Sequence, residues 1–227
     1  MEIVDLSHPI HDGMDCYFPL PRVAMWTFTH HEVTKKLYIN SSSSTKALFL
    51  SDHTGTHVDA PLHFDPEGGD VAQLPLAPFV SRGAVLDVSH LEDRAEIGAQ
   101  DLAGCPNADL LGEGFAALVR TGRDKLWGDP RYVDHPHLTG ESARWFLEKG
   151  VGLVGIDALS MDSVHVKEKA VHNTLLKGRQ IPTVENLCRL ELVGEGVFIF
   201  IALPLHLVGA TGSPVRAVGL KGVKGWQ

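Results

Sequence analysis

Short apolar runs, separated by clusters of glycine, proline and polar residues, recur along the whole chain. Each run is four to six residues long, a length typical of β-strands and too short for a stable helix. The pattern therefore predicts several short strands joined by turns. These strands are Ile3 to Leu6, Ala47 to Leu50, Ala84 to Val88, Phe115 to Arg120 and Val151 to Ile156.

Helix signals occur in two other places. Thr139 is a suitable N-cap for a helix that runs to Lys149, and Gly150 follows directly, where helices commonly end. A shorter helix is predicted to begin at Gln100. Strands before and after a helix favour a mixed α/β fold. Since no internal repeat or linker is visible, we expect one domain over residues 1–227.

Composition and charge narrow the classes of function. The 227 residues, of which 44% are hydrophobic and 21% charged, are ordinary for a globular protein with one sizeable core. The net charge is −8, and no run rich in lysine or arginine is present. This balance argues against nucleic acid and anionic membranes as partners, and it leaves small molecules.

The cysteines and the apolar segments predict a cytoplasmic location. Cys16, Cys105 and Cys188 are widely spaced and include no C-x-x-C pair, so neither a disulfide framework nor a thiolate zinc site is indicated. The N-terminal residues lack the pattern of a signal peptide. The strongest apolar run, Val197 to Leu205, is too short to span a bilayer.

The highest density of reactive side chains lies between His53 and His63, which reads H-T-G-T-H-V-D-A-P-L-H. This stretch supplies three imidazoles and one carboxylate, the ligand types that zinc and manganese commonly bind. Gly55, Pro61 and several β-branched residues disfavour a helix here. We therefore expect an extended run.

Alternate side chains of an extended run share one side, so the candidate ligands should all face one way. Gly55 would leave room for a metal or a substrate to approach. The alternative is a polar surface strand in a histidine-rich protein. The predicted ligand side holds His53, His57, Asp59 and His63. The predicted packing side holds Thr54, Thr56, Val58, Leu62 and Phe64.

Weaker candidates lie in the N-terminal part of the chain. His8 and His11 belong to the turn-rich segment S-H-P-I-H-D-G-M and are either ligands or surface-loop histidines. Tyr17 and Phe18 are candidates for contacts with an aromatic substrate, or they fill an edge of the core. Ser41 to Ser44 predicts a flexible loop.

The central stretch resembles the H-x-G-T-H-x-D-x-P-x-H signature of the cyclase-like metal hydrolases, whose members include bacterial kynurenine formamidase and isatin hydrolase. The resemblance extends over nearly the whole chain, and it implies a single α/β domain of the swivelling β/β/α type with a barrel-like sheet. It also implies a homodimer or a higher assembly of dimers. Further matching blocks are Ile3 to Pro9 with Gly13 and Met14, Gly155 to Asp162, and Ile201 to Ala217.

The same resemblance implies two divalent ions per chain, with zinc favoured and manganese as the alternative, bridged by two carboxylates. His172 and Glu185 occupy places that match family ligands, and His165 is the nearby competitor for the role of His172. One ion would be held by His53, His57, Asp59 and Glu185, and the other by Asp59, His172 and Glu185.

His63 is then free for proton transfer, and its equivalent in the family is the general acid/base. The alternative is that His63 is a further metal ligand. The implied activity is hydrolysis of a small aromatic amide. The preferred reaction is conversion of N-formyl-L-kynurenine to L-kynurenine and formate. Opening of a cyclic amide such as isatin is the alternative, because other members of the family open such rings. The segment Cys16 to Pro21 lacks the Trp-Pro-Gly-Asp-like text of kynurenine formamidases, so it does not decide between the two substrates.

Two other classes of function would draw on the same residues. A non-catalytic metal-binding protein would use the cluster for storage or sensing, and it would not need His63 once its ligand set was filled. Hydrolysis by a serine nucleophile is disfavoured, because the sequence has no G-x-S-x-G elbow.

Overall fold

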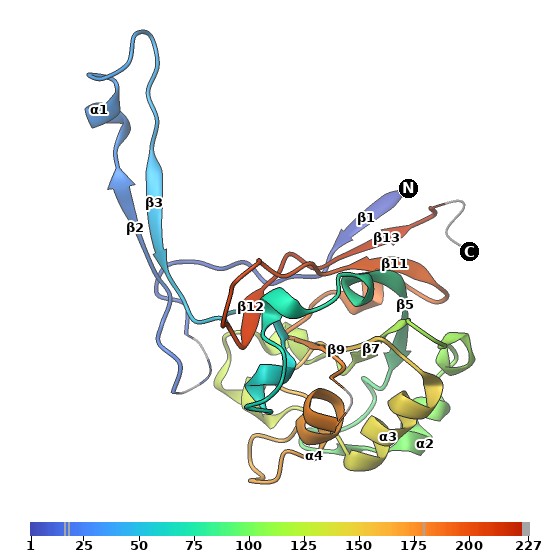
Figure 1. Ribbon diagram of the computed structural model, residues 1–227. Coiled ribbons are helices and arrows are strands. Elements are labelled where there is room, and N and C mark those ends of the chain that lie inside the picture. The colour runs from blue at the N-terminus through green and yellow to red at the C-terminus, as the bar shows by residue number, and fades with distance from the viewer. Residues whose placement is uncertain (16, 18, 179, 224–227) are drawn as a thin grey trace.

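The computed structural model describes residues 1–15, 17, 19–178 and 180–223. At its centre is a curled nine-stranded sheet with the order β1-β13-β11-β5-β7-β9-β10-β4-β12 (Figure 1). The mixed α/β class that the sequence pattern predicts and the barrel-like sheet that the family resemblance implies are both confirmed. The strands are β1 Glu2–Asp5, β4 His57–Asp59, β5 Val80–Asp87, β7 Ala116–Arg120, β9 Leu153–Ile156, β10 Thr183–Glu185, β11 Phe198–Ile201, β12 Gly212–Pro214 and β13 Val218–Lys221.

The middle of the sheet is parallel and its two edges are antiparallel. Strands β5, β7, β9 and β10 run parallel to one another, and β10 then pairs antiparallel with β4. Every residue of β9 and nearly every residue of β7 is buried. Parallel strands that are covered on both faces need apolar residues on both faces, which explains the continuous apolar runs in the sequence.

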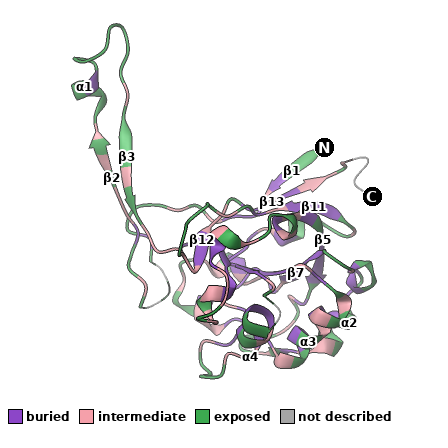
Figure 2. Ribbon diagram, viewed as in Figure 1, coloured by how far each residue is buried: buried purple, intermediate pink, exposed green. Residues whose placement is uncertain are grey.

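Hydrophobic clusters cover both faces of this central part. Val154 and Ile156 belong to one cluster, which also contains Phe146 and Leu102 from two helices. Leu153 points to the opposite cluster, as the two-residue period of a strand requires. The helices on the first face are α2 Ala99–Ala103, α3 Gly140–Lys149 and the short α4 Ala170–His172 (Figures 1 and 2).

The longest helix begins and ends where the sequence predicts. The Thr139 side chain accepts a hydrogen bond from the Ser142 backbone N–H, and Gly150 adopts the left-handed conformation with φ 72°. Phe146 on the buried face is fully enclosed, which stabilises the fold by roughly 2 kcal/mol. The predicted short helix at Gln100 is α2.

A hairpin projects away from the body of the molecule (Figure 1). It consists of β2 Ala24–Thr29 and β3 Thr45–Phe49, paired antiparallel, with α1 His31–Thr34 between them toward the tip. We call residues 24–49 the arm. The predicted strand at Ala47 is therefore present as β3, but it lies in the exposed arm and not in the core (Figure 2).

The remaining strands form a small parallel pair, β6 Glu96–Ile97 with β8 His137–Leu138. The four-serine run lies near the tip of the arm, outside helices and strands. Among the described cysteines, Cys105 and Cys188 are buried and unpaired, and Cys16 lies outside the described residues. Within the described residues, no helix is long and apolar enough to cross a membrane. The cytoplasmic location stays a prediction.

Candidate metal centre

Two neighbouring strands, β4 and β10, bring three ligand-type side chains together. His57 and Asp59 are two residues apart on β4, so both side chains lie on the same face. Glu185 on β10 pairs directly with His57 in the antiparallel register. Side chains opposite one another in such a pair are close neighbours, which places the Glu185 carboxylate beside both β4 ligands.

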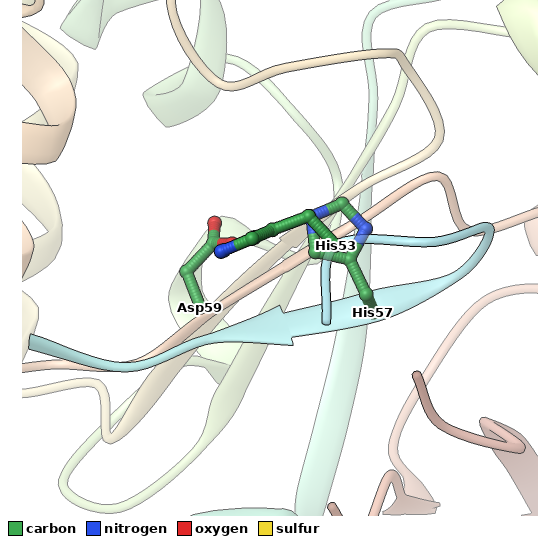
Figure 3. A group of neighbouring side chains, drawn as sticks. All are labelled: His53, His57 and Asp59. Atoms are coloured by element: carbon green, nitrogen blue, oxygen red, sulfur yellow. The ribbon is translucent and has the colours of Figure 1, made fainter. Parts of the chain in front are cut away.

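His53 reaches the same place from a turn that precedes β4 (Figure 3). The turn passes through Gly55, whose φ of 65° is the left-handed region that glycine tolerates. On the far side, β12 pairs with β4 and passes very close to His53. A Cβ at Gly212 would lie 2.8 Å from the His53 Cε1 atom and 2.6 Å from the Val58 carbonyl oxygen, so only glycine fits there.

His172 completes the site from the end of α4. Its backbone N–H donates to the Asp162 carboxylate, as does the N–H of Val171, so this short helix is anchored to the loop after β9. The ligand atoms in each of two groups lie within 4.8 Å of one another. The groups are His53, His57 and Asp59, and Asp59, His172 and Glu185.

Hydrogen bonds on one ring nitrogen leave the other nitrogen of two imidazoles free. His57 Nδ1 donates to the Gly55 carbonyl at 2.8 Å, and His172 Nδ1 donates to Asp162 Oδ2 at 2.5 Å. Because a carbonyl and a carboxylate only accept, the neutral form of each ring carries its proton on Nδ1 and has the lone pair on Nε2. A neutral imidazole with a free nitrogen, oriented by such a partner, is the form that binds metals.

The free nitrogens face the two carboxylates symmetrically. His57 Nε2 lies 3.3 Å from Asp59 Oδ1 and 3.8 Å from Glu185 Oε2. His172 Nε2 lies 3.3 Å from Glu185 Oε1 and 3.8 Å from Asp59 Oδ2. Each carboxylate thus presents one oxygen to each ring. Both carboxylates can therefore contribute to a divalent metal site.

Both carboxylates are held in place by further donors. The Thr183 hydroxyl donates to Asp59 Oδ2 at 2.8 Å, and the Met161 backbone N–H donates to Glu185 Oε1 at 2.7 Å. Asp59 and Glu185 are both buried. Buried carboxylates with fixed orientation are costly unless opposite charge compensates them.

The electrostatics of the site fit a bound cation. Burial lowers the pKa of His57, but Asp59 and Glu185 outweigh burial and raise it to about 9. Burial likewise lowers the pKa of His172, and hydrogen bonds with Asp162, Asp59 and Glu185 raise it well above its usual range. Without metal the site therefore keeps protons between its nitrogens and oxygens, and divalent ions would replace these protons on binding.

His63 is held differently from the other imidazoles. Its ring centroid lies 4.1 Å from that of His53 and 4.9 Å from that of Phe64, and among the described residues its side chain makes no hydrogen bond. Burial lowers the pKa of His63, which keeps the ring neutral at neutral pH. A neutral, unbonded imidazole beside a charged cluster can take up or release a proton.

The predicted extended run from His53 to His63 is wrong in most of its length. Only His57–Asp59 is a strand, and His63 ends the 3-10 helix Pro61–His63. Pro61 starts that helix, since its fixed φ suits a first helical position. His57 and Asp59 share one face of β4 by parity, as predicted, whereas His53 and His63 join them because the chain turns on both sides of β4.

Two residues in this stretch have roles that differ from the predictions. Phe64 was expected on the packing side, yet its ring stacks on His172 with centroids 4.5 Å apart. Gly55 was expected to make room for a metal or substrate. A Cβ there would instead meet the Ile10 side chain at 3.3 Å, so the glycine serves the left-handed turn.

Other predicted candidates lie outside the cluster. His165 is 41% exposed and its Nε2 bonds to Asp134, so His172 and not His165 stands in the metal-type group. His8 stacks on Trp127 with ring centroids 4.1 Å apart, and His11 is exposed. Tyr17 is 47% exposed, and its contact with substrate stays a prediction. Phe18 lies outside the described residues.

The orienting residues were not identified from the sequence. Asp162 stands in the block G-I-D-A-L-S-M-D, which resembles a family block but indicates no role for this residue. Thr183 and Thr211 carry no signal of their own, because a threonine that orients a ligand looks the same in sequence as one that lines a turn. Only the pairing of distant strands distinguishes them.

A half-barrel sheet with buried histidine and carboxylate groups at one edge places the chain among metal-dependent hydrolases of the cyclase type. The family model described as "Putative cyclase" matches residues 4–163. The chain belongs to this family.

Relatives and solved structures agree with this assignment. The chain is 36% identical to a kynurenine formamidase of Bacillus cereus over 220 residues, 96% of each chain, and 35% identical to that of Bacillus anthracis over 95% of each. It is 28% identical to a predicted metal-dependent hydrolase from Bacillus stearothermophilus, with a TM-score of 0.75 over 96% and 97% of the two chains.

The fold also matches isatin hydrolase A from Labrenzia aggregata, with a TM-score of 0.84, 24% identity and 96% and 93% of the two chains covered. These similarities and the two side-chain groups suggest a divalent metal.

Proposed function

We propose that this chain is a metal-dependent hydrolase of small aromatic amides, with conversion of N-formyl-L-kynurenine to L-kynurenine and formate as its main reaction. One observation carries the proposal. Carboxylate oxygens of Asp59 and Glu185 lie 3.3 Å from the Nε2 atoms of His57 and His172, respectively. The 36% identity to kynurenine formamidase over 96% of both chains supports the substrate.

We propose two ions per chain, zinc in preference and manganese as the alternative, because histidine and carboxylate donors suit both. A divalent ion supplies Lewis-acid chemistry when bound, since it lowers the pKa of water far enough for attack at neutral pH. One ion would be held by His53, His57, Asp59 and Glu185, and the second by Asp59, His172 and Glu185.

His63 would act as the proton carrier. An amide nitrogen leaves poorly as an anion, so the reaction needs a group that protonates it as the C–N bond breaks. The neutral His63 ring lies beside His53 and its side chain is free of hydrogen bonds among the described residues. The ring can therefore accept a proton from the attacking water and deliver it to the leaving nitrogen.

Isatin-type cyclic amides are the second candidate substrate class. Hydrolysis of a ring amide needs the same residues, and the fold is shared with isatin hydrolase at a TM-score of 0.84. The identity to that protein is 24%, lower than the 36% to kynurenine formamidase, so the formamide ranks first.

A hydrolysis screen of the metal-loaded protein against N-formylkynurenine, isatin and simple aryl formamides tests the proposal. The highest kcat/KM is expected for N-formylkynurenine, and isatin as the best substrate would replace the formamidase assignment. Tight metal binding without turnover of any amide would instead favour a non-catalytic metal-binding protein.

We also propose that two copies associate through the arm. The arm is a two-stranded hairpin. Such a hairpin is only marginally stable in water by itself, so packing against a second copy would stabilise it. Its large apolar side chains are open to solvent, with Ile39 92% and Phe28 72% exposed. The arm carries three lysines and one glutamate, whereas the whole chain has a charge of −8, so a basic arm would meet an acidic body.

The oligomeric state in solution tests this association. The parent is expected to be a dimer or an assembly of dimers by light scattering, and the double variant Phe28→Glu and Ile39→Glu a monomer. Leu192→Glu is the control, since Leu192 is also 51% exposed but lies outside the arm. A monomeric parent, or equal dissociation in both variants, would contradict the arm as the interface.

A further inference from the structure

The His53 ring is oriented opposite to the other two imidazoles of the site. Its Nδ1 atom, and not Nε2, faces the cluster, and without metal it donates to Asp59 Oδ1 at 2.7 Å, a proton that a bound ion would replace. Its Nε2 atom points away and lies 2.8 Å from the Thr211 hydroxyl oxygen. His57 and His172 have the reverse arrangement, with Nδ1 bonded to an acceptor outside the cluster.

The direction of the hydrogen bonds beyond His53 follows from what Asp52 can do. Asp52 Oδ2 accepts from the Thr211 backbone N–H at 3.0 Å and from the Thr211 hydroxyl at 2.8 Å. An ionised carboxylate only accepts, so the single hydroxyl proton of Thr211 points to Asp52. The hydroxyl oxygen is then left as the acceptor for the proton on His53 Nε2.

We propose that Asp52 and Thr211 are positioning residues that keep a proton on His53 Nε2 and thereby present the Nδ1 lone pair to a divalent ion. The inference rests on the proposed metal-dependent function. It names the binding atom of each ring: Nδ1 for His53, and Nε2 for His57 and His172.

The packing around His53 fixes the place at which Thr211 meets the ring. Gly212 follows Thr211 in the chain, and a Cβ at that position would lie 3.0 Å from His53 Nδ1 and 2.8 Å from Cε1. The Thr211 carbonyl accepts from the Ala60 N–H at 2.8 Å, so the backbone that carries the hydroxyl is tied to the end of β4. Thr211 therefore approaches His53 at a fixed place.

A matched set of variants tests the role of the hydroxyl. Thr211→Val keeps the shape of the side chain but removes both hydrogen bonds, and Thr211→Ser keeps the hydroxyl. Loss of a partner that orients a metal-binding histidine typically weakens metal affinity by about 10- to 100-fold. We expect the Kd for zinc, measured by chelator competition, to rise by that factor in Thr211→Val and to return near the parent value in Thr211→Ser.

Ser89→Ala serves as the control for loss of a half-buried hydroxyl. Ser89 accepts from Arg120 at 2.9 Å and lies just beyond β5, outside the metal-type groups. Its zinc Kd should equal that of the parent. Asp162→Asn is the mirror case, because it should weaken binding through His172 and leave the group of His53 intact. Unchanged affinity in Thr211→Val, or no recovery in Thr211→Ser, would overturn the inference.

A crystal structure of the zinc-loaded parent gives an independent readout. The expected result is an ion bound by His53 Nδ1 and His57 Nε2, with His53 Nε2 on the Thr211 hydroxyl. An ion on His53 Nε2 would overturn the inference even if the hydrolase activity is found. If the parent binds no metal, the proposed function fails, and the inference, which names a metal-binding atom, fails with it. Metal binding through Nδ1 without amide hydrolysis would contradict only the proposed function.

Discussion

The imidazoles of this protein differ in what holds them, and this difference predicts what each variant will do. His57 and His172 each donate from Nδ1 to a fixed acceptor, which costs them rotational freedom but orients the other nitrogen. His63 is held by ring contacts with His53 and Phe64. A ligand has to be fixed before the ion arrives, whereas a proton carrier has to exchange partners during the reaction.

His63→Ala should therefore separate catalysis from metal binding. We expect metal content near that of the parent and a kcat lower by roughly 10²- to 10⁴-fold, the usual contribution of a positioned general acid/base. His57→Ala should lose metal as well as rate. Elemental analysis and kinetics on both variants check this expectation, and equal metal loss in the two would make His63 a ligand.

The loss at His63 should also depend on the substrate. Ring-substituted formanilides with better leaving amines need less protonation on departure, so the defect of His63→Ala should shrink along such a series. A defect of constant size would remove His63 from the proton transfer step.

Glu185 and His172 should differ in how much metal each retains. Glu185 faces His57 with one oxygen and His172 with the other, so Glu185→Gln is expected to lower metal per chain more than His172→Ala. The matched control is His165→Ala, because His165 is a nearby exposed histidine bonded to Asp134. Metal loss in His165→Ala with none in His172→Ala would contradict the assignment.

At the scale of elements, the site depends on how closely three short strands approach. β4 lies between β10 and β12, and each of the three strands is three residues long. Such short strands supply few hydrogen bonds, so their positions depend on side-chain packing and on the close approach at Gly212. A change in β12 should thus be transmitted to His53.

Gly212→Ala tests this close approach. The added methyl group would overlap the Val58 carbonyl and the His53 ring, which should destabilise the fold by about 1 to 3 kcal/mol and also lower zinc affinity. Gly112→Ala is the control, since a Cβ there meets nothing within 4 Å. Thermal unfolding and zinc titration of both variants provide the measurement. If Gly212→Ala has the stability and zinc affinity of the parent, β12 can move to accommodate the methyl group and the prediction is wrong.

At the scale of the whole molecule, metal and protons compete for one buried cluster. The pKa of His57 without metal is about 9, above its ordinary value of 6.5. A raised pKa in the folded state contributes stability below the unfolded value, and this contribution is lost as the pH rises through about 9. Metal binding requires the unprotonated ring and becomes stronger over the same interval.

The difference in Tm between zinc-loaded and metal-free protein should therefore grow as the pH rises from 6.5 toward 9. Groups outside the cluster titrate in both forms, so the difference isolates the site. Thermal scans of both forms at several pH values provide the measurement. A constant difference over this range would show that the cluster carries no such protons.

Chelation should also abolish activity, and added Zn²⁺ or Mn²⁺ should restore it, because the attacking water needs a cation. Elemental analysis must accompany the assay to show that the chelated protein is free of metal. Full turnover by metal-free protein would contradict the proposed mechanism.

The sequence by itself determined the local elements and the kind of chemistry. The helix from Gly140 to Lys149 follows from its N-cap and from Gly150, and the strands β7 and β9 follow from apolar runs, because capping and burial patterns act over a few residues. The density of histidine and carboxylate around β4 and the family blocks indicated a metal-dependent hydrolase. Those signals are also local in the chain.

Only the tertiary structure decided how the ligand-type side chains meet. Thr183 bonds to Asp59 across 124 positions of sequence, and Glu185 lies beside His57 because β10 pairs with β4. The stacking of Phe64 on His172 and the reversed ring of His53 depend on the same distant pairings. Periodicity cannot report them, since the free energy that selects a ring orientation comes from atoms that approach only after the sheet has formed.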